Sequence, residues 1–132
     1  MTDPSLELQR SLVARLRAPG VLPYGVGVFD DVPEGAGFPY VSLGDGQVLP
    51  DKAECVDGAE AFLQIDVWTQ TVGYGETKTI AGRIVAALDD QALTVAGFDV
   101  VVFELQGAQY MRDPDGRTRH GALTFRAVVT AT

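Results

Sequence analysis

The sequence predicts an α+β domain in which two α-helices pack on one face of an antiparallel, or at most mixed, β-sheet. Two segments carry apolar residues at helical spacing, and three segments alternate apolar and polar residues as strands do. Their order along the chain is helix, strands, helix, strands, which is typical of this class. The last two strands are expected to form a long C-terminal β-hairpin, and residues 1–132 to form a single domain.

The two helices are expected at residues 4–17 and at about 76–88. Asp3 or Ser5 can cap the start of the first helix, and the Pro-Gly pair at 19–20 ends it. Each helix has one apolar stripe that would face the sheet. These stripes consist of Leu8, Leu12 and Leu16 in the first helix and of Ile80, Ile84 and Leu88 in the second.

Three long strands are expected at residues 59–71, 98–111 and 117–129. Their inward residues would be Leu63, Ile65 and Val67, then Val101, Phe103, Leu105 and Gly107, then Leu123, Phe125, Ala127 and Val129. The opposite face would carry Phe62, Trp68, Val100, Val102 and Val128. Either a partner covers this face, or its apolar residues are the scattered ones that any surface has.

Shorter extended pieces are expected at 26–29, at 40–43, with a continuation towards Leu49 as an alternative, and at 93–95. Residues 30–39 are a loop by their Pro, Gly and Asp content, and the glycine-rich, acidic stretch at about 44–58 is predicted to be a long loop between strands. The tip of the hairpin is "DPDG", residues 113–116. In this turn Asp bonds its own backbone, Pro fixes φ and Gly takes a positive φ.

The composition excludes several classes of protein. A net charge of −8 argues against a surface that binds nucleic acid tightly, because such a surface needs clustered Lys and Arg. No apolar run is long enough to span a bilayer, and the N-terminal residues do not form a secretory signal. Cys55 is the only cysteine, so neither an intrachain disulfide nor a cysteine-rich metal site is expected, and the expected compartment is the cytosol or a particle assembled there.

No constellation for catalysis emerges from the sequence. His120 is the only histidine, and nothing places Ser42 or Cys55 beside it as a nucleophile. Cys55 also has no basic neighbour in sequence that would lower its pKa. A role for His120 in hydrogen bonding at a turn or an interface is therefore favoured, and Trp68 is expected in a core or an interface.

No cofactor or metal site is expected either. "DPDGRTRHG" begins like a calcium loop, but Thr118 and Thr124 stand where the EF-hand pattern needs Gly and Glu. "GYGETK", residues 73–78, lacks the spacing of the phosphate-binding loops, and Glu76 would repel an anion there. The acidic residues of the 30–34 segment and of the 45–60 segment show no ligand spacing.

Several segments together resemble a known protein family. They are "LQRSLVARL", "VFDDVP…FPYVSLG", "VWTQTVGYGETKTIAGRI" and "RHGALTFRA". This combination is similar to the tail-completion proteins of long-tailed phages, also called tail terminators or tail-to-head joining proteins, and to their counterparts in gene transfer agents. The resemblance covers nearly the whole chain, although each segment alone is an ordinary strand or helix start.

The resemblance implies a structural virion protein and no enzyme. Such proteins form a homo-hexameric ring that caps the tail tube, ends its polymerisation and joins the tail to the neck or head-completion protein. DNA would pass through the lumen without specific binding, and the protein would lie at the tail-neck junction of a particle assembled in the bacterial cytoplasm. Eight residues are then expected at contacts with other subunits or with the tube: Trp68, Arg112, Asp113, Asp115, Arg117, Arg119, His120 and Arg126.

Two alternatives remain at this stage. The first is another ring-forming component of the particle, such as a head-completion or stopper protein of the neck. The second is a small soluble ligand-binding or enzymatic α+β domain, which predicts a defined pocket and loss of activity when His120 or Asp66 is changed.

Overall fold

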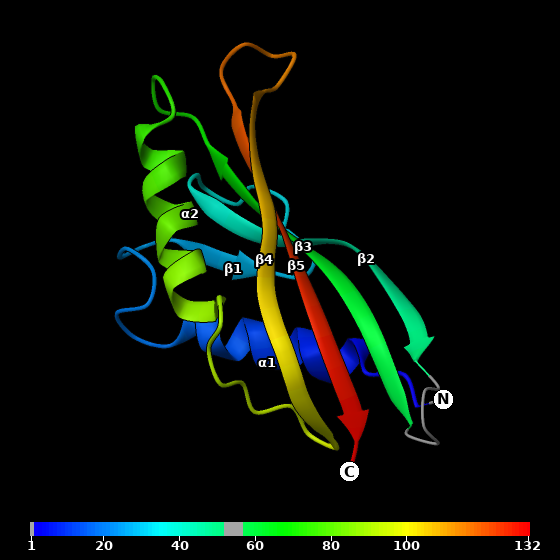
Figure 1. Cartoon of the computed structure of the whole chain (residues 1–132). Coiled ribbons are helices and arrows are strands. Elements are labelled where there is room, and N and C mark those ends of the chain that lie inside the picture. Colours follow the sequence, from blue (N-terminus) through cyan, green and yellow to red (C-terminus); the bar gives the residue numbers. More distant parts are fainter. Residues whose placement is uncertain (1, 52–56) are drawn as a thin grey trace.

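The computed structural model describes residues 2–51 and 57–132 and contains two helices and a five-stranded sheet (Figure 1). In chain order the elements are α1 (Ser5–Arg17), β1 (Gly27–Phe29), β2 (Tyr40–Asp51), β3 (Gly58–Thr69), α2 (Gly75–Leu88), β4 (Phe98–Arg112) and β5 (Arg119–Ala131). The predicted α+β class is confirmed. None of the helices in the described ranges is long and apolar enough to cross a membrane.

The strands are arranged in the order β1-β2-β3-β5-β4. β1 runs parallel to β2, and the remaining neighbours are antiparallel, so the sheet is mixed. The two edge strands differ greatly in length, because β1 pairs with only Tyr40–Ser42 whereas β4 pairs along most of β5. The turn between β4 and β5 projects beyond the rest of the sheet (Figure 1).

Both helices pack against the same face of the sheet with the stripes that the sequence predicts. Leu8, Leu12 and Ile84 are buried completely or almost completely, and they belong to one core cluster with the inward residues of β3 and β5. Arg17 fixes the C-terminal end of α1 to β1, because its Nε and Nη2 both donate to the carbonyl of Val28. At the other end of α1, Pro4 occupies the N-cap position and no side chain caps the helix, so the predicted cap by Asp3 or Ser5 is wrong, although the Asp3 side chain accepts a hydrogen bond from the Ser5 N–H.

The faces of β3 and β5 agree with the prediction, since Ile65, Val67, Leu123 and Phe125 are fully buried. The predicted faces of β4 are partly wrong. Its register against β5 shifts between Val100 and Val102 and again between Leu105 and Gly107. Each bulge adds one residue and reverses the alternation.

As a result, Val100 lies opposite Val129 on the helix side, where the sequence predicts an outward residue. Val101 is 63% exposed instead of inward, whereas Phe103 is buried as expected. Gly107 follows the second bulge and lies opposite the outward Thr124. Val102 and Val128 do lie opposite each other on the open face.

The loop predicted at about 44–58 is mostly a strand. β2 extends from Tyr40 to Asp51 and pairs with β3 down to the pair Asp51–Gly58, with an irregularity between Leu43 and Gly46. The glycines at 44 and 46 therefore belong to a bulge rather than to a mobile arm. Residues 52–56, which include Cys55, lie outside the described residues. The strand predicted at 93–95 is only an isolated bridge between Val95 and Phe98.

The turn at the tip of the hairpin is held by Asp115. Its carboxylate accepts hydrogen bonds from the backbone N–H groups of Arg117 and Thr118, each at 2.8 Å, and from the Thr118 hydroxyl at 2.6 Å. Gly116 has a φ of 74°, which favours glycine at this position. The hydrogen bonds, first of all that from the Thr118 hydroxyl, lower the pKa of Asp115 from 3.8 to about 2.

Two substitutions of the same kind on α1 test the packing. Leu12→Ala removes a side chain that is 0% exposed and should lower the free energy of unfolding by about 2–5 kcal/mol. Leu6→Ala removes a side chain that is 54% exposed and should change it by less than about 0.5 kcal/mol. Urea denaturation followed by circular dichroism measures both values, and equal losses would contradict the assigned orientation of α1.

The pKa of Asp115 makes the hairpin turn sensitive to acid. Because this pKa is lowered on folding, ionised Asp115 stabilises the turn fully above pH 3.8, and the contribution is lost as the pH falls towards 2. A carboxyl-carbon NMR titration should show Asp115 titrating near pH 2, with the Thr118 amide shift following it. In Asp115→Asn the amide shift should no longer titrate in this range. A midpoint at or above 3.8 in the native chain would contradict the hydrogen-bonded turn.

Candidate interaction surfaces

A cluster of polar and aromatic side chains lies on the open face of the sheet, away from the helices. Trp68 of β3 lies opposite His120 of β5, and their rings stack with centroids 3.9 Å apart and planes 8° apart. His120 Nε2 lies 2.5 Å from Asp66 Oδ1, which also accepts a hydrogen bond from Gln64. The indole N–H of Trp68 donates to Ser42 Oγ at 2.9 Å.

This cluster brings together residues that the enzymatic alternative named, but their hydrogen bonds hold side chains together on the surface of the sheet. Ser42 Oγ accepts a hydrogen bond from Trp68, and no hydrogen bond among the described residues joins Ser42 to His120. A nucleophile would need such a bond to its base. Gly44 allows the close packing, since a Cβ there would lie 2.4 Å from Asp66 Oδ2. The arrangement orients His120 through Asp66, and no hydroxyl among the described residues is hydrogen-bonded to its ring.

Arg126 forms the second cluster on the open face and links three strands. Its guanidinium group contacts Glu60 of β3 through Nε at 2.5 Å and Glu104 of β4 through Nη1 at 3.1 Å. The hydrogen bond to Glu60 is the largest cause of the raised pKa of Arg126. Phe62 lies directly opposite Arg126, so this part of the face is mixed apolar and charged.

The tip of the hairpin carries four of the predicted contact residues, and they have different roles. Asp115 is engaged inside the turn, and the carbonyl of Asp113 accepts from the Gly116 N–H. Arg112 and Arg117 are exposed, and their side chains form no hydrogen bond or ion pair with any residue in the described ranges. The two arginines are therefore the groups at the tip that can reach a partner.

Arg119 lies elsewhere than the sequence suggests, because it faces the helix side and is only 8% exposed. Its guanidinium carbon lies 5.7 Å from the centre of the Tyr74 ring, and Nη1 donates to the carbonyl of Arg117. Lys78 of α2 lies over both Tyr74 and Tyr110, at 5.9 and 5.3 Å. The sequence does not predict this aromatic and cationic group. Tyr74 and Lys78 are four residues apart at the start of a helix, which indicates that they are neighbours. The inward direction of Tyr110 could not be predicted, because the bulges of β4 reverse its alternation.

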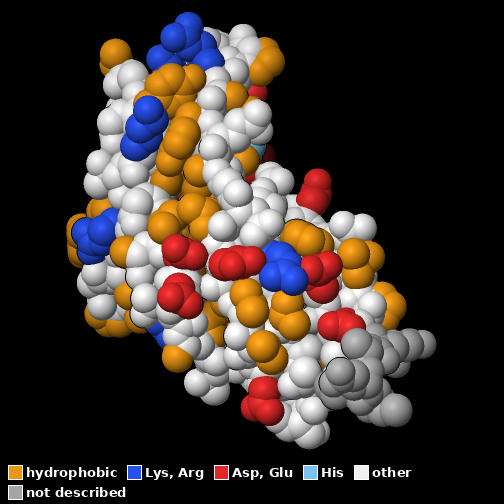
Figure 2. All heavy atoms as spheres, in the orientation of Figure 1, with side chains coloured by type: hydrophobic (Ala, Val, Ile, Leu, Met, Phe, Trp, Pro, Cys, Tyr) orange, Lys and Arg blue, Asp and Glu red, His pale blue; other side chains and the backbone are white. Residues whose placement is uncertain are grey.

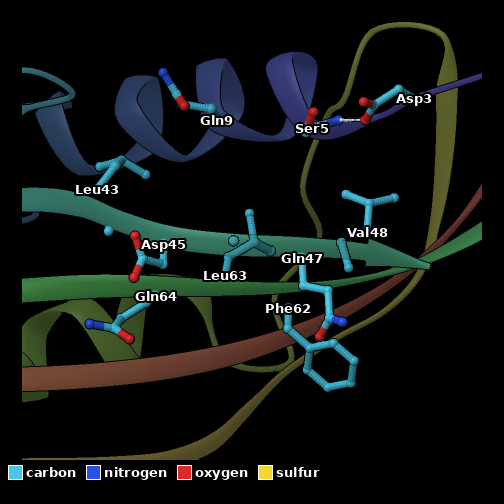
Figure 3. Close-up of a pocket in the computed structure, with 13 residues that line it drawn as sticks. Asp3, Ser5, Gln9, Leu43, Asp45, Gln47, Val48, Phe62, Leu63 and Gln64 are labelled. Carbon is cyan, nitrogen blue, oxygen red and sulfur yellow. Dashed lines mark hydrogen bonds between the residues drawn. The ribbon is translucent and has the colours of Figure 1, made fainter.

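A cleft of about 460 Å³ lies between the N-terminal half of α1 and the second half of β2. Figure 3 places Ser5 and Gln9 of α1 on one side of it, and Leu43, Asp45 and Val48 of β2 on the other. The lining mixes aliphatic side chains with amides and carboxylates. Among the described residues, no group of three or more His, Cys, Asp or Glu side chains can hold a metal ion, here or elsewhere.

Charged side chains are distributed unevenly over the molecule. In Figure 2, Lys and Arg side chains gather at the end formed by the β4–β5 turn, and Asp and Glu side chains gather around the middle of the visible face. This separation leaves a basic end on a chain with a net charge of −8. Two molecules therefore attract each other best when the basic end of one meets an acidic part of the other.

Comparison with known proteins identifies the family. The model of the family described as tail completion protein gp17 matches residues 10–130. The tail completion protein gp17 of Bacillus phage SPP1 is 32% identical over 92 residues, which are 70% of this chain and 68% of that protein.

Solved structures give the same result. A chain of the virion of a native gene transfer agent particle superposes with a TM-score of 0.90 and 29% identity, over 99% of this chain and 100% of that chain. The gp17 protein of bacteriophage SPP1 superposes with a TM-score of 0.62 and 25% identity, over 97% and 90% of the two chains. The family model and the fold agree over nearly the whole length and the sequence match over 70% of it, and the chain belongs to the structural tail completion proteins of the gp17 family.

Proposed function

We propose that this protein acts at the tail-neck junction of a phage or gene transfer agent particle. In this proposal it forms a hexameric ring on the end of the tail tube, stops the polymerisation of the tube and joins the tail to the neck. Its partners are further copies of itself, the tail tube protein and a neck or head-completion protein. Its work consists of binding, with no catalysed reaction and no cofactor.

The observation that carries this proposal is the extent of the structural match. The chain superposes end to end on a chain from a gene transfer agent virion, with a TM-score of 0.90. The match covers 99% of this chain and 100% of that chain. The stacking of His120 on Trp68 and its hydrogen bond with Asp66 support a packing role for this pair on the sheet face.

Two exposed surfaces fit contacts within such an assembly. The first is the open face of the sheet, with Trp68, His120 and Arg126, whose aromatic and arginine side chains are types enriched at interfaces. The second is the hairpin tip, where Asp113 and Asp115 shape the turn and Arg112 and Arg117 extend from it. Arg119, which is buried, supports this tip from the helix side.

The charge of the protein suits a ring through which DNA passes. A net charge of −8 repels phosphate groups and so disfavours retention of DNA in the lumen. The cations that remain exposed at the hairpin end would be neutralised by contacts with protein. The ring would thus let DNA slide without binding it.

Charge reversal at the hairpin tip tests the proposal. Arg117→Glu should leave the fold intact, because the side chain is exposed, and should weaken ring formation or capping of the tube by about tenfold. Native mass spectrometry over a concentration series measures ring formation. Electron microscopy of purified tube protein, polymerised with and without this chain, measures tube length.

Arg10→Glu is the matched control, since Arg10 is exposed on α1, distant from the hairpin, and its reversal changes the net charge equally. It should assemble like the native chain. If the native chain neither forms a sixfold ring nor limits tube length, the proposed function is wrong. If the native chain does both and Arg117→Glu behaves identically, the hairpin tip is not a contact.

A further inference from the structure

Two stretches of the outer strands have no neighbouring strand. On one side of the sheet, β1 covers β2 only at Tyr40–Ser42, so β2 from Gly44 to Pro50 has no neighbouring strand on that side within the described part of the chain. On the other side, β4 is an edge strand along its whole length. Open edges carry unpaired N–H and C=O groups, which are able to pair with another strand.

The segment that follows α2 is hydrogen-bonded to β4 at two points. The N–H of Asp90 donates to the carbonyl of Phe103 at 2.9 Å, and the Asp89 carboxylate accepts from the N–H of Leu105 at 2.9 Å. Val95 forms a bridge with Phe98, and a cavity of about 620 Å³ lies between the segment and residues 100–104. The longest stretch of β4 without such a contact is Gln106–Arg112, in which Gly107, Ala108 and their flanking glutamines are exposed.

The open edge of β2 faces space that can admit a strand. The 460 Å³ cleft lies between this edge and the N-terminal half of α1 (Figure 3). Along the first residues of β2, this place beside the strand is taken by β1. The carbonyl of Val28 in β1 accepts a hydrogen bond from Arg17 at the C-terminal end of α1. The cleft thus continues the position that β1 occupies, at a place where this chain provides no strand of its own.

We propose that the open edge of β4 in one copy pairs antiparallel with the open edge of β2 in the next copy, beside α1. This inference rests on the proposed ring and specifies its subunit contact. The directions agree, because β2, β3, β5 and β4 alternate in direction across the sheet. If the sheet continues into the next copy with the same face outward, β4 of one copy therefore runs antiparallel to β2 of the next.

Length and side-chain direction specify the register of this contact. Beyond their bulges, the stretches 46–51 of β2 and 107–112 of β4 are equally long, and antiparallel alignment places Gly46 opposite Arg112. This register joins residues of the same face, because Gln47 and Met111 both lie on the open face, opposite Phe62 and His120. Pro50 has no N–H, so the ladder is expected to run from the pair Gly46–Arg112 to the pair Leu49–Gln109.

The proposed pairing also suits ring closure. The open half of β2 lies beside the Gly58 end of β3, whereas the open half of β4 lies beside the Arg119 end of β5. Successive copies are therefore staggered along the strand direction, as strands must be when a sheet closes on itself. The contact is also heterologous, because it joins two different surfaces, and a heterologous contact can close into a ring.

Cysteine cross-linking tests the proposed register. In a Cys55→Ser background, Gln47→Cys combined with Met111→Cys should give disulfide-linked oligomers on mild oxidation, seen by non-reducing electrophoresis. Directly opposed residues have Cα atoms within disulfide range, whereas β3 and β5 separate these positions within one chain. Gln47→Cys with Gly107→Cys is the matched control, four residues out of register on the same face, and should link few chains.

Native mass spectrometry of the native chain provides the second measurement, because it shows whether a ring forms. Equal cross-linking of the matched and control pairs would overturn the register. A native ring without the cross-link would overturn the edge pairing while leaving the ring in place. Absence of any ring from the native chain would instead refute the function on which this contact rests.

Discussion

The pairing of β3 with β5 is the constraint on which the rest of the structure depends. These strands oppose each other from Gly58–Thr130 to Thr69–Arg119 without a register shift. Their inner residues form the floor of the core on which α2 packs, and the leucines of α1 belong to the same core cluster. The same pairing sets His120 against Trp68 and brings Arg126 within reach of Glu60 on the outer face. A shift of one residue would exchange the two faces and lose the core and both clusters together.

The uninterrupted elements could be predicted from the sequence, because each repeats a regular period. The alternation Leu123, Phe125, Ala127 and Val129 indicates a strand with one buried face, and that face is buried. The leucine stripe of α1 predicts the buried face of that helix equally directly. β4 has the same composition, but its two bulges change the direction of its side chains at positions that period alone does not mark. The second half of β2 could not be predicted as a strand either, because glycines on both sides of Asp45 and a proline at 50 are typical of loops. A strand at the edge of a sheet tolerates such residues.

Contacts between side chains of different strands could not be predicted from the sequence, for a different reason. The Asp66–His120 pair and the Arg126 cluster depend on which strands are neighbours and in which register. Nothing local to His120 indicates that an aspartate from another strand will orient it. The predicted contact residues therefore separate into three groups in the structure: an open-face group, an exposed tip, and Arg119 beneath the tip. The exposure of Arg112 and Arg117, in contrast, follows directly from their place in a polar turn.

The two hydrogen bonds that join Asp89 and Asp90 to β4 have a consequence for the unassembled protein. A long, flat and unprotected edge strand is a template on which chains stack into fibrils. Here the bonds at Phe103 and Leu105 occupy backbone groups in the middle of that edge, and the bulges on either side interrupt its flatness. An edge divided in this way is a poorer template for the growth of fibrils.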